Sequence, residues 1–285
     1  MDQHERILIG DLLRCPQGQV DVPSLDAAAT PGARGGRKEA LAQMDELGAE
    51  LSELQERLFA RGRAEPQQAR RMLVVLQGLD TAGKGGVVRH TFGLVDPQGI
   101  RLKAFKAPTP EELEHDFLWR IRRELPGPGM IGVFDRSHYE DVLAVRVNRL
   151  VEESVWRARF ETINRFEAEL AASGTHVVKC FLNVSKGEQK ERLAARLEDP
   201  AKYWKYSSSD LDTRSHWDGY MDAYGEVLQR TNPDIAPWYV IPADHKWYRN
   251  WAVARIMLET LRGMQLTWPP ASFDVAEERR RVARS

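Results

Sequence analysis

Short apolar runs alternate with longer amphipathic stretches over most of the chain. Four runs are predicted to be buried strands because they are short, continuous and apolar: 72–77, 130–134, 176–184 and 238–242. A fifth and weaker strand candidate is 100–107. The intervening segments show apolar residues at helical spacing, over 83–94, 111–123, 151–172, 186–197 and 248–261. Strands that alternate with helices predict a parallel sheet covered by helices on both faces.

One long amphipathic helix, predicted over 39–62, precedes this alternation. Its apolar residues recur at helical spacing, at Leu41, Met44, Leu47, Leu51, Leu54 and Leu58. Such a helix would cover a sheet edge or pack against another subunit. We therefore expect an N-terminal extension over 1–70, a central α/β domain over 71–266, and a solvated tail over 267–285.

Composition excludes several classes of protein. The 285 residues include 41 Lys and Arg against 42 Asp and Glu, a balance that argues against a dedicated nucleic-acid binder but permits a local basic groove. The two cysteines exclude a disulfide framework and a cysteine zinc site, and Cys180 is interpreted as a buried core residue. The N-terminus lacks the apolar run of a signal peptide, and no run reaches the length of a membrane span. We expect a cytoplasmic protein with no membrane or nucleic-acid partner.

The stretch GLDTAGKGG has the spacing of a phosphate-binding loop, G-x-x-x-x-G-K, from Gly78 to Lys84. It follows a predicted strand and begins a predicted helix, so its backbone amides can point at a phosphate that Lys84 neutralises. The expected phosphate-binding residues are Gly78, Ala82, Gly83, Lys84, Gly85 and Gly86. The alternative is a glycine-rich connector, which would not require the strand, the lysine and the helix together.

Gly85 occupies the position where such loops usually place a Ser or Thr hydroxyl on Mg²⁺. Magnesium prefers oxygen ligands and is usually held by one or two carboxylates, waters and substrate phosphates. Asp80 lies within the loop, and Asp135 ends another predicted strand, so both belong to the carboxyl edge of the sheet. We therefore predict Asp80 and Asp135 as metal ligands, with Asp80 also able to orient a phosphate acceptor.

The segment DRSHYED after the 130–134 strand adds further polar residues. Arg136 supplies a cation where negative charge would spread over a transferring phosphoryl group. His138 is interpreted as structural or substrate-orienting, because transfer to a phosphate oxygen needs no base at neutral pH. Glu140 and Asp141 are expected to cap the following helix, since acids favour helix N-termini.

More than fifty residues separate the 176–184 and 238–242 strands, too many for a plain crossover. Arg192 and Arg196 share one face of a predicted helix, and Lys202 and Lys205 follow among aromatic residues. We interpret about 186–225 as a lid that closes on phosphates; the alternative is a charged surface hairpin. Together with further cations such as Lys103 and Lys106, these positive charges favour a long or highly charged anion as the ligand.

Several blocks spread over 70–266 together resemble the family-2 polyphosphate kinases: GLDTAGKGG, FKAPTPEELEHDFLWRI, GMIGVFDRSHYEDVLAVRV, HWDGYMDAYGEVLQRT and APWYVIPADHKWYRNW. The resemblance implies a P-loop kinase-like (thymidylate-kinase-like) three-layer α/β/α sandwich with a parallel sheet and a helical lid. It also implies reversible phosphoryl transfer between inorganic polyphosphate and purine nucleotides. The metal would be Mg²⁺, with Mn²⁺ as a substitute.

By position, the resemblance implies that the catalytic residues are Asp80, Lys84, Asp135, Arg136, Arg192 and Arg196. Asp80 and Asp135 would bind metal and orient the acceptor, Lys84 and Arg136 would grip phosphate, and the other two arginines would be lid cations. The expected polyphosphate channel comprises Lys103, Lys106, Lys202 and Lys205. The implied acceptors are ADP and GDP; AMP stays open, because the branch that accepts monophosphates often has Asn where this chain has Asp135. Relatives of this kind often form homodimers or homotetramers.

Two other functions share parts of this pattern. An ATP-dependent nucleoside monophosphate kinase would have the same loop, fold and lid. A non-catalytic sensor of nucleotides or polyanions would agree with Gly85 but not with the two aspartates. Nucleotide product formed from polyphosphate without ATP would exclude the ATP-dependent kinase. Mg²⁺-dependent turnover would exclude the non-catalytic sensor.

Overall fold

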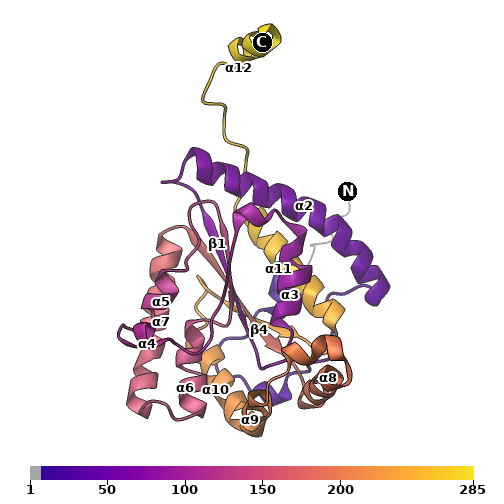
Figure 1. Cartoon of the computed structure of the whole chain (residues 1–285), viewed down its shortest axis with the longest axis vertical. Helices are drawn as coiled ribbons and strands as arrows, with labels where there is room; N and C mark the ends of the chain where they lie inside the picture. The colour runs from indigo at the N-terminus through magenta and orange to yellow at the C-terminus, as the bar shows by residue number, and fades with distance from the viewer. Residues whose placement is uncertain (1–7) are drawn as a thin grey trace.

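The computed structural model describes residues 8–285, and its centre is a sheet of five parallel strands (Figure 1). The strand order is β2-β3-β1-β4-β5. Their bounds are β1 Arg71–Gln77, β2 Ile100–Ala104, β3 Ile131–Asp135, β4 Thr175–Asn183 and β5 Trp238–Pro242. All five predicted strands are confirmed, although β2 ends three residues earlier than expected. β1 lies in the middle, and its residues 72–76 are completely buried, as a strand covered on both faces requires.

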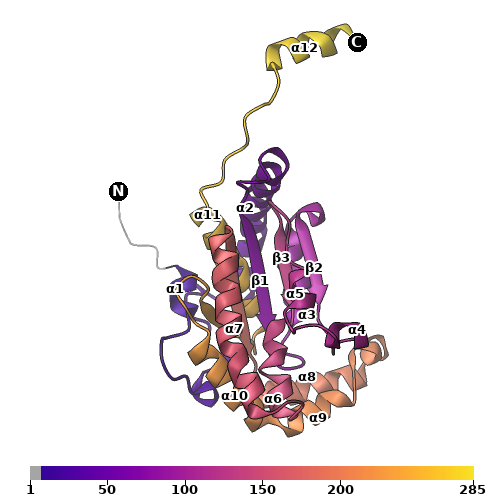
Figure 2. The same cartoon turned by 90° about the vertical axis from the view of Figure 1, so that its left-hand side faces the viewer.

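Helices cover both faces of the sheet, which confirms the three-layer arrangement (Figures 1 and 2). On one face lie α3 Lys84–His90 and α11 Lys246–Gly263, and on the other lies α7 Glu153–Ala172 against β4. The remaining α-helices are α1 Ile9–Leu13, α2 Arg37–Ala64, α4 Pro110–Leu113, α5 Trp119–Arg122, α6 Ala144–Val147, α8 Lys186–Glu198, α9 Ser209–Ser215, α10 Trp217–Arg230 and α12 Val275–Arg284. Five short 3₁₀ segments complete the described chain: η1 Val22–Ser24, η2 Phe92–Leu94, η3 Pro97–Gly99, η4 His138–Asp141 and η5 Pro200–Lys205.

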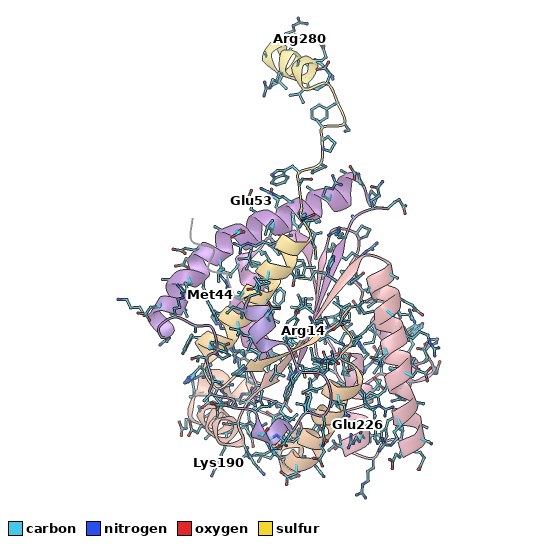
Figure 3. All side chains as sticks on the ribbon, turned by 180° about the vertical axis from the view of Figure 1, so that it is seen from behind. Arg14, Met44, Glu53, Lys190, Glu226 and Arg280 are labelled. Carbon is cyan, nitrogen blue, oxygen red and sulfur yellow. The ribbon has the colours of Figure 1, made fainter. Side chains whose placement is uncertain are left out.

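The long amphipathic helix predicted upstream of the sheet is α2. Its buried face includes Leu51 and Leu58, both with no exposed surface, and packs mainly against α11 of the same chain. Met44 and Glu53 mark this helix in Figure 3. Arg262 of α11 forms an ion pair with Glu50, which ties the two helices at their surface. The helix therefore adds a layer outside α11 instead of covering an edge of the sheet.

Two helical regions were not predicted. The C-terminal residues, expected to be a solvated tail, are exposed but form α12, which stands away from the rest of the chain (Figures 1–3; Arg280 is labelled in Figure 3). Asp274 caps this helix by accepting bonds from two backbone amides. α10, which begins within the predicted lid and ends beyond it, buries Tyr220, Tyr224 and Val227 in the main core. Among the described residues no helix is long and apolar enough to cross a membrane.

Candidate active site

The predicted phosphate-binding loop connects β1 to α3 at the carboxyl edge of the sheet. Gly78 and Gly83 have positive φ angles of 151° and 108°, and Thr81 has a φ of 66°. Left-handed conformations of this kind favour glycine and are uncommon for other residues. Gly83 is also the residue before the first turn of α3. The glycines therefore allow the chain to turn tightly between the strand and the helix.

Lys84 is buried and its ammonium group bonds the loop itself. Nζ donates to the carbonyl oxygens of Gly78 at 2.7 Å and Leu79 at 3.4 Å. Burial and, after it, the neighbouring Arg136 charge lower the pKa of Lys84, whereas nearby carboxylates oppose this shift. Two of those carboxylates belong to Asp135 and Asp80, so both predicted metal ligands lie close enough to act on the loop lysine.

The neighbouring strand β3 brings Arg136 to the same place. Asp135 pairs in register with Leu76 of β1, and the Arg136 amide donates to the Leu76 carbonyl oxygen at 3.0 Å. The Arg136 guanidinium then forms an ion pair with Asp80, with Nη2 and Oδ1 2.6 Å apart. The structure thus brings Asp80, Lys84, Asp135 and Arg136 into one cluster, with Arg136 bonded to a carboxylate in this conformation.

This donor set suits a divalent ion that is completed by the substrate. In the part of the chain that is described, no group of three or more His, Cys, Asp or Glu side chains could hold a metal alone. Magnesium commonly takes one or two carboxylates and obtains its other oxygen ligands from waters and substrate phosphates. Asp80 and Asp135 at neighbouring strand ends fit that pattern, and the second oxygen of Asp80 is not engaged by Arg136.

Glu140 is a third carboxylate of the cluster, which the sequence analysis did not assign to the site. Glu140 and Asp141 do lie in the first turn of η4, but the side chain that caps this turn is Ser137, whose Oγ accepts from the Tyr139 amide. Burial raises the pKa of Glu140, and the charges of Arg136 and Lys84 counteract that shift. Asp141 instead forms an ion pair with Arg159, with the two atoms 3.1 Å apart.

A buried polar network lies behind this segment. The side chains of His138, Tyr139, Glu167 and Lys179 have no exposed surface. Glu167 accepts bonds from the Tyr139 hydroxyl at 2.7 Å and from Lys179 Nζ at 2.6 Å, and it lies 3.2 Å from His138 Nε2. His138 was predicted to be structural or substrate-orienting, and its ring has no contact with solvent in this network.

Part of the predicted lid faces the outer side of the loop and encloses a pocket of about 460 Å³. Six Lys and Arg side chains line it, against two glutamates, Glu188 and Glu191. The six are Arg192, Arg196, Lys202, Lys205, Lys246 and Arg249. The structure therefore brings the four predicted lid cations together and adds two from the start of α11. Lys246 and Arg249 were not predicted from the sequence, because no spacing rule relates the start of α11 to a loop more than 150 residues earlier.

The two predicted lid arginines bond the protein in this conformation. Arg192 is buried and donates to the carbonyl oxygens of Thr81, Ala243 and Asp244 at 2.7–2.8 Å. Arg196 donates to the Lys205 carbonyl oxygen at 2.7 Å and to Asp210 at 2.9 Å. Arg192 thus ties α8 to the phosphate loop, and Arg196 ties α8 to the rest of the lid.

The predicted channel lysines lie in two different places. Lys202 and Lys205 line the pocket, whereas Lys103 and Lys106 do not. Lys103 is on β2, the strand at the far edge of the sheet, and forms an ion pair with Glu124 at 2.9 Å. Lys106 follows β2 and is exposed. In this conformation the four lysines do not form one continuous surface along the pocket.

Comparison with known proteins gives consistent results. The family model described as "Polyphosphate kinase 2 (PPK2)" matches residues 37–268. An AMP/ADP-polyphosphate phosphotransferase of Meiothermus ruber is 43% identical over 254 residues, which cover 89% of this chain and 93% of that protein. An ADP-polyphosphate phosphotransferase of Rhodopseudomonas palustris is 42% identical over 231 residues, covering 77% and 78%. The crystal structure of Polyphosphate Kinase 2 from Arthrobacter aurescens TC1 superposes with a TM-score of 0.94 at 49% identity and covers 98% of this chain and 97% of that one.

Proposed function

Because the chain belongs to the polyphosphate kinase 2 family of phosphotransferases, we propose that it transfers phosphoryl groups reversibly between inorganic polyphosphate and purine nucleotides. The acceptors are ADP and GDP, with AMP as a further acceptor. The observation that carries this proposal is the pocket of six cationic side chains beside the phosphate loop, in a chain whose formal net charge is −1. A long polyanion explains such local accumulation of positive charge better than a single nucleotide tail does.

The loop and the pocket have complementary tasks in this proposal. The loop amides and Lys84 bind the terminal phosphoryl group, and the phosphates behind it lie in the pocket along Lys202, Lys205 and Lys246. An oxygen of the acceptor's last phosphate attacks the terminal phosphorus atom, and the bond to the next phosphate of the polymer breaks. The polymer becomes one unit shorter, and no covalent enzyme intermediate is needed. Lys103 and Lys106 stay predictions as outer contacts of the polymer.

Positioning and charge neutralisation supply the catalysis, as is general for phosphoryl transfer. A divalent ion, Mg²⁺ with Mn²⁺ as a substitute, would be held by Asp80 and Asp135 and would neutralise negative charge between donor and acceptor phosphates. Asp80 would also orient the acceptor. Arg136, which donates to Asp80 in this conformation, would contact the transferring group by exchanging that bond for one to phosphate. Because transfer to a phosphate oxygen needs no base at neutral pH, the mechanism requires no proton transfer by the buried His138.

The test supplies purified protein with long-chain polyphosphate, Mg²⁺ and ADP, GDP or AMP, without ATP, and measures nucleotide products by chromatography. We expect product with the unmodified chain and none with Asp80→Ala or Lys84→Ala. Lys190→Ala is the matched control, because Lys190 is exposed on α8 and lies at the outside of the molecule (Figure 3). Activity that required ATP as the donor would instead favour a nucleoside monophosphate kinase, and near-normal activity of either site variant would refute the site assignment.

We also propose that the chain associates with itself as a homodimer or homotetramer. Light scattering of the purified protein tests this proposal, and a monomeric mass at assay concentration would contradict it.

A further inference from the structure

Side chains hydrogen-bond the carbonyl groups of the phosphate loop. Each carbonyl oxygen of residues 78–82 accepts a hydrogen bond from a side chain. Lys84 serves the first two, and Gln189 serves the third at 3.0 Å. Arg192 donates to the fourth at 2.8 Å. Arg249 donates to the fifth at 3.0 Å, and Arg192 adds a longer bond to the same oxygen at 3.4 Å. The loop is therefore held from outside by α8 and α11.

Bonds to these carbonyl groups also determine where the amides point. A trans peptide is planar, so its C=O and the following N–H point in opposite directions. The Arg249 bond to the Ala82 carbonyl oxygen, the shorter of the two side-chain bonds there, therefore helps to set the orientation of the Gly83 amide, the last one before α3 begins. Amides at this position are those that a phosphate-binding loop presents to its ligand.

Arg249 occupies an unusual position for an arginine. Its side chain is 3% exposed, and no carboxylate in residues 8–285 lies within ion-pair distance of it. Its other hydrogen bonds go to Asn250 Oδ1, at 3.2 Å from Nε and 3.0 Å from Nη2. Burial, and secondarily the charge of Arg192, lower the pKa of Arg249 to about 9. Burying a cation without a carboxylate partner costs folding free energy, and the hydrogen bonds to Asn250 and to the Ala82 carbonyl oxygen offset only part of that cost.

Two loop glycines leave the space that this guanidinium fills. A Cβ atom on Gly83 would lie 1.7 Å from Nη1 of Arg249, and one on Gly86 would lie 2.5 Å from Nη2. Gly85 differs, because a Cβ atom there would have nothing described within 4 Å. Gly86 does not have a positive φ angle, so its backbone conformation does not require glycine at this position.

We propose that Arg249 is a positioning residue of the phosphate loop. Its guanidinium holds the Ala82–Gly83 peptide so that the Gly83 amide faces the phosphate, and Gly86 is glycine because the guanidinium occupies the space of a side chain. The activity readouts below rest on the proposed function, whereas the exchange readout does not.

The first test compares Arg249→Met with Arg249→Lys, with Arg262→Met as the control on the same helix. Arg262 is half exposed, and its ion pair among residues 8–285 is with Glu50 at the surface. Misplacing one loop amide should lower kcat/KM for polyphosphate by about 10-fold to 100-fold in the methionine variant. The lysine variant should recover part of this loss, since an ammonium group can still donate to the carbonyl oxygen. A pure packing role predicts the opposite order, because methionine fills the space without a buried charge.

The second test is a double-mutant cycle between the two sites. Gly86→Ala should impair the chain that carries Arg249 but add little in the Arg249→Met background, because the overlap with the guanidinium is then removed. Additive losses would overturn the proposed relation between Gly86 and Arg249. This cycle remains informative if one single variant is unstable, since stability can be measured for all four proteins by urea denaturation.

The third readout is independent of catalysis. Hydrogen exchange in a peptide covering 78–86 of the ligand-free protein should become faster in Arg249→Met and unchanged in Arg262→Met. If polyphosphate-driven transfer is absent from the unmodified chain but this difference is present, the proposed function fails and the positioning role stands. Equal exchange in both variants, with equal activity, would overturn the positioning role.

Discussion

Replacing Lys179 with methionine should destabilise this protein strongly. Lys179 lies on β4, has no exposed surface, and donates to Glu167 at 2.6 Å, to the Tyr139 hydroxyl at 3.0 Å and to the Thr231 carbonyl oxygen at 2.6 Å. Methionine keeps most of the apolar stem but removes the charge and all three bonds. Glu167 would then be a buried carboxylate without its cation.

The expected loss follows from the burial of both partners. Removing one partner of a buried ion pair costs about 3–5 kcal/mol, because the remaining charge stays uncompensated. At about 2–4 °C per kcal/mol for chains of roughly this size, the melting temperature should fall by roughly 6–20 °C. Replacing both members, in Lys179→Met with Glu167→Gln, should cost less than the sum of the single changes by about 1–3 kcal/mol.

The pH dependence provides a second and sharper criterion. Burial alone would raise the pKa of Glu167, but Lys179 and then His138 hold it below its usual value. Without Lys179, burial should dominate and raise that pKa, so Glu167 is favoured in its protonated form in the folded variant. The unfolded chain then loses the Glu167 proton at a lower pH than the folded variant does, so the stability linked to this group is lost as pH rises. The loss in free energy of unfolding caused by Lys179→Met should therefore be larger at about pH 8 than at about pH 5.

The assay is urea denaturation of both single variants, the double variant and Arg165→Met, followed by tryptophan fluorescence at the two pH values. Arg165 forms an exposed ion pair with Glu161 on α7, so its replacement should cost less than about 1 kcal/mol. A loss below about 1 kcal/mol for Lys179→Met, or full additivity in the double variant, would refute the reasoning.

Three further predictions concern other parts of the molecule. Gly62→Ala should cost about 1–3 kcal/mol in urea denaturation, because its Cβ atom would lie 2.3 Å from a backbone carbonyl oxygen; an effect within error would contradict this close packing. Arg196→Ala removes the bonds to the Lys205 carbonyl oxygen and Asp210, so trypsin should cleave the lid faster and the KM for polyphosphate should rise several-fold. Burial raises the pKa of Cys15 to about 11 and of Cys180 to about 12, so neither thiol should react with a disulfide reagent at pH 8 until the chain unfolds. Above about pH 9 the thiols ionise in the unfolded chain but stay protonated in the folded one. The free energy of unfolding should therefore be lower at pH 10 than at pH 8, as urea denaturation at the two pH values can show.

Local patterns in the sequence were sufficient for the elements that the active site is built on. The strand before Gly78 and the helix after it were predicted because an apolar run, a glycine-rich turn and a lysine are neighbours in the chain. The ends of neighbouring parallel strands also indicated that Asp80 and Asp135 would lie at one edge, and the charges of both act on Lys84 in the structure. Helix α12 was missed because its many charges suggested a tail, although pairs such as Glu277–Arg280 and its cap support a short helix.

Residues joined only through tertiary packing could not be assigned in this way. Patterns of neighbouring residues were enough to locate the phosphate loop, the five strands and the cations Arg192, Arg196, Lys202 and Lys205 of the predicted lid, because each is recognised from residues close together in the chain. Three-dimensional packing was needed to show that Arg249 lies against Gly83 and Gly86, that Glu140 joins the aspartates, and that Lys103 lies apart from the pocket. The physical reason is that helix α11 and strand β2 reach their places through the packing of whole elements, and that packing selects which of many similar charged side chains face the phosphate loop.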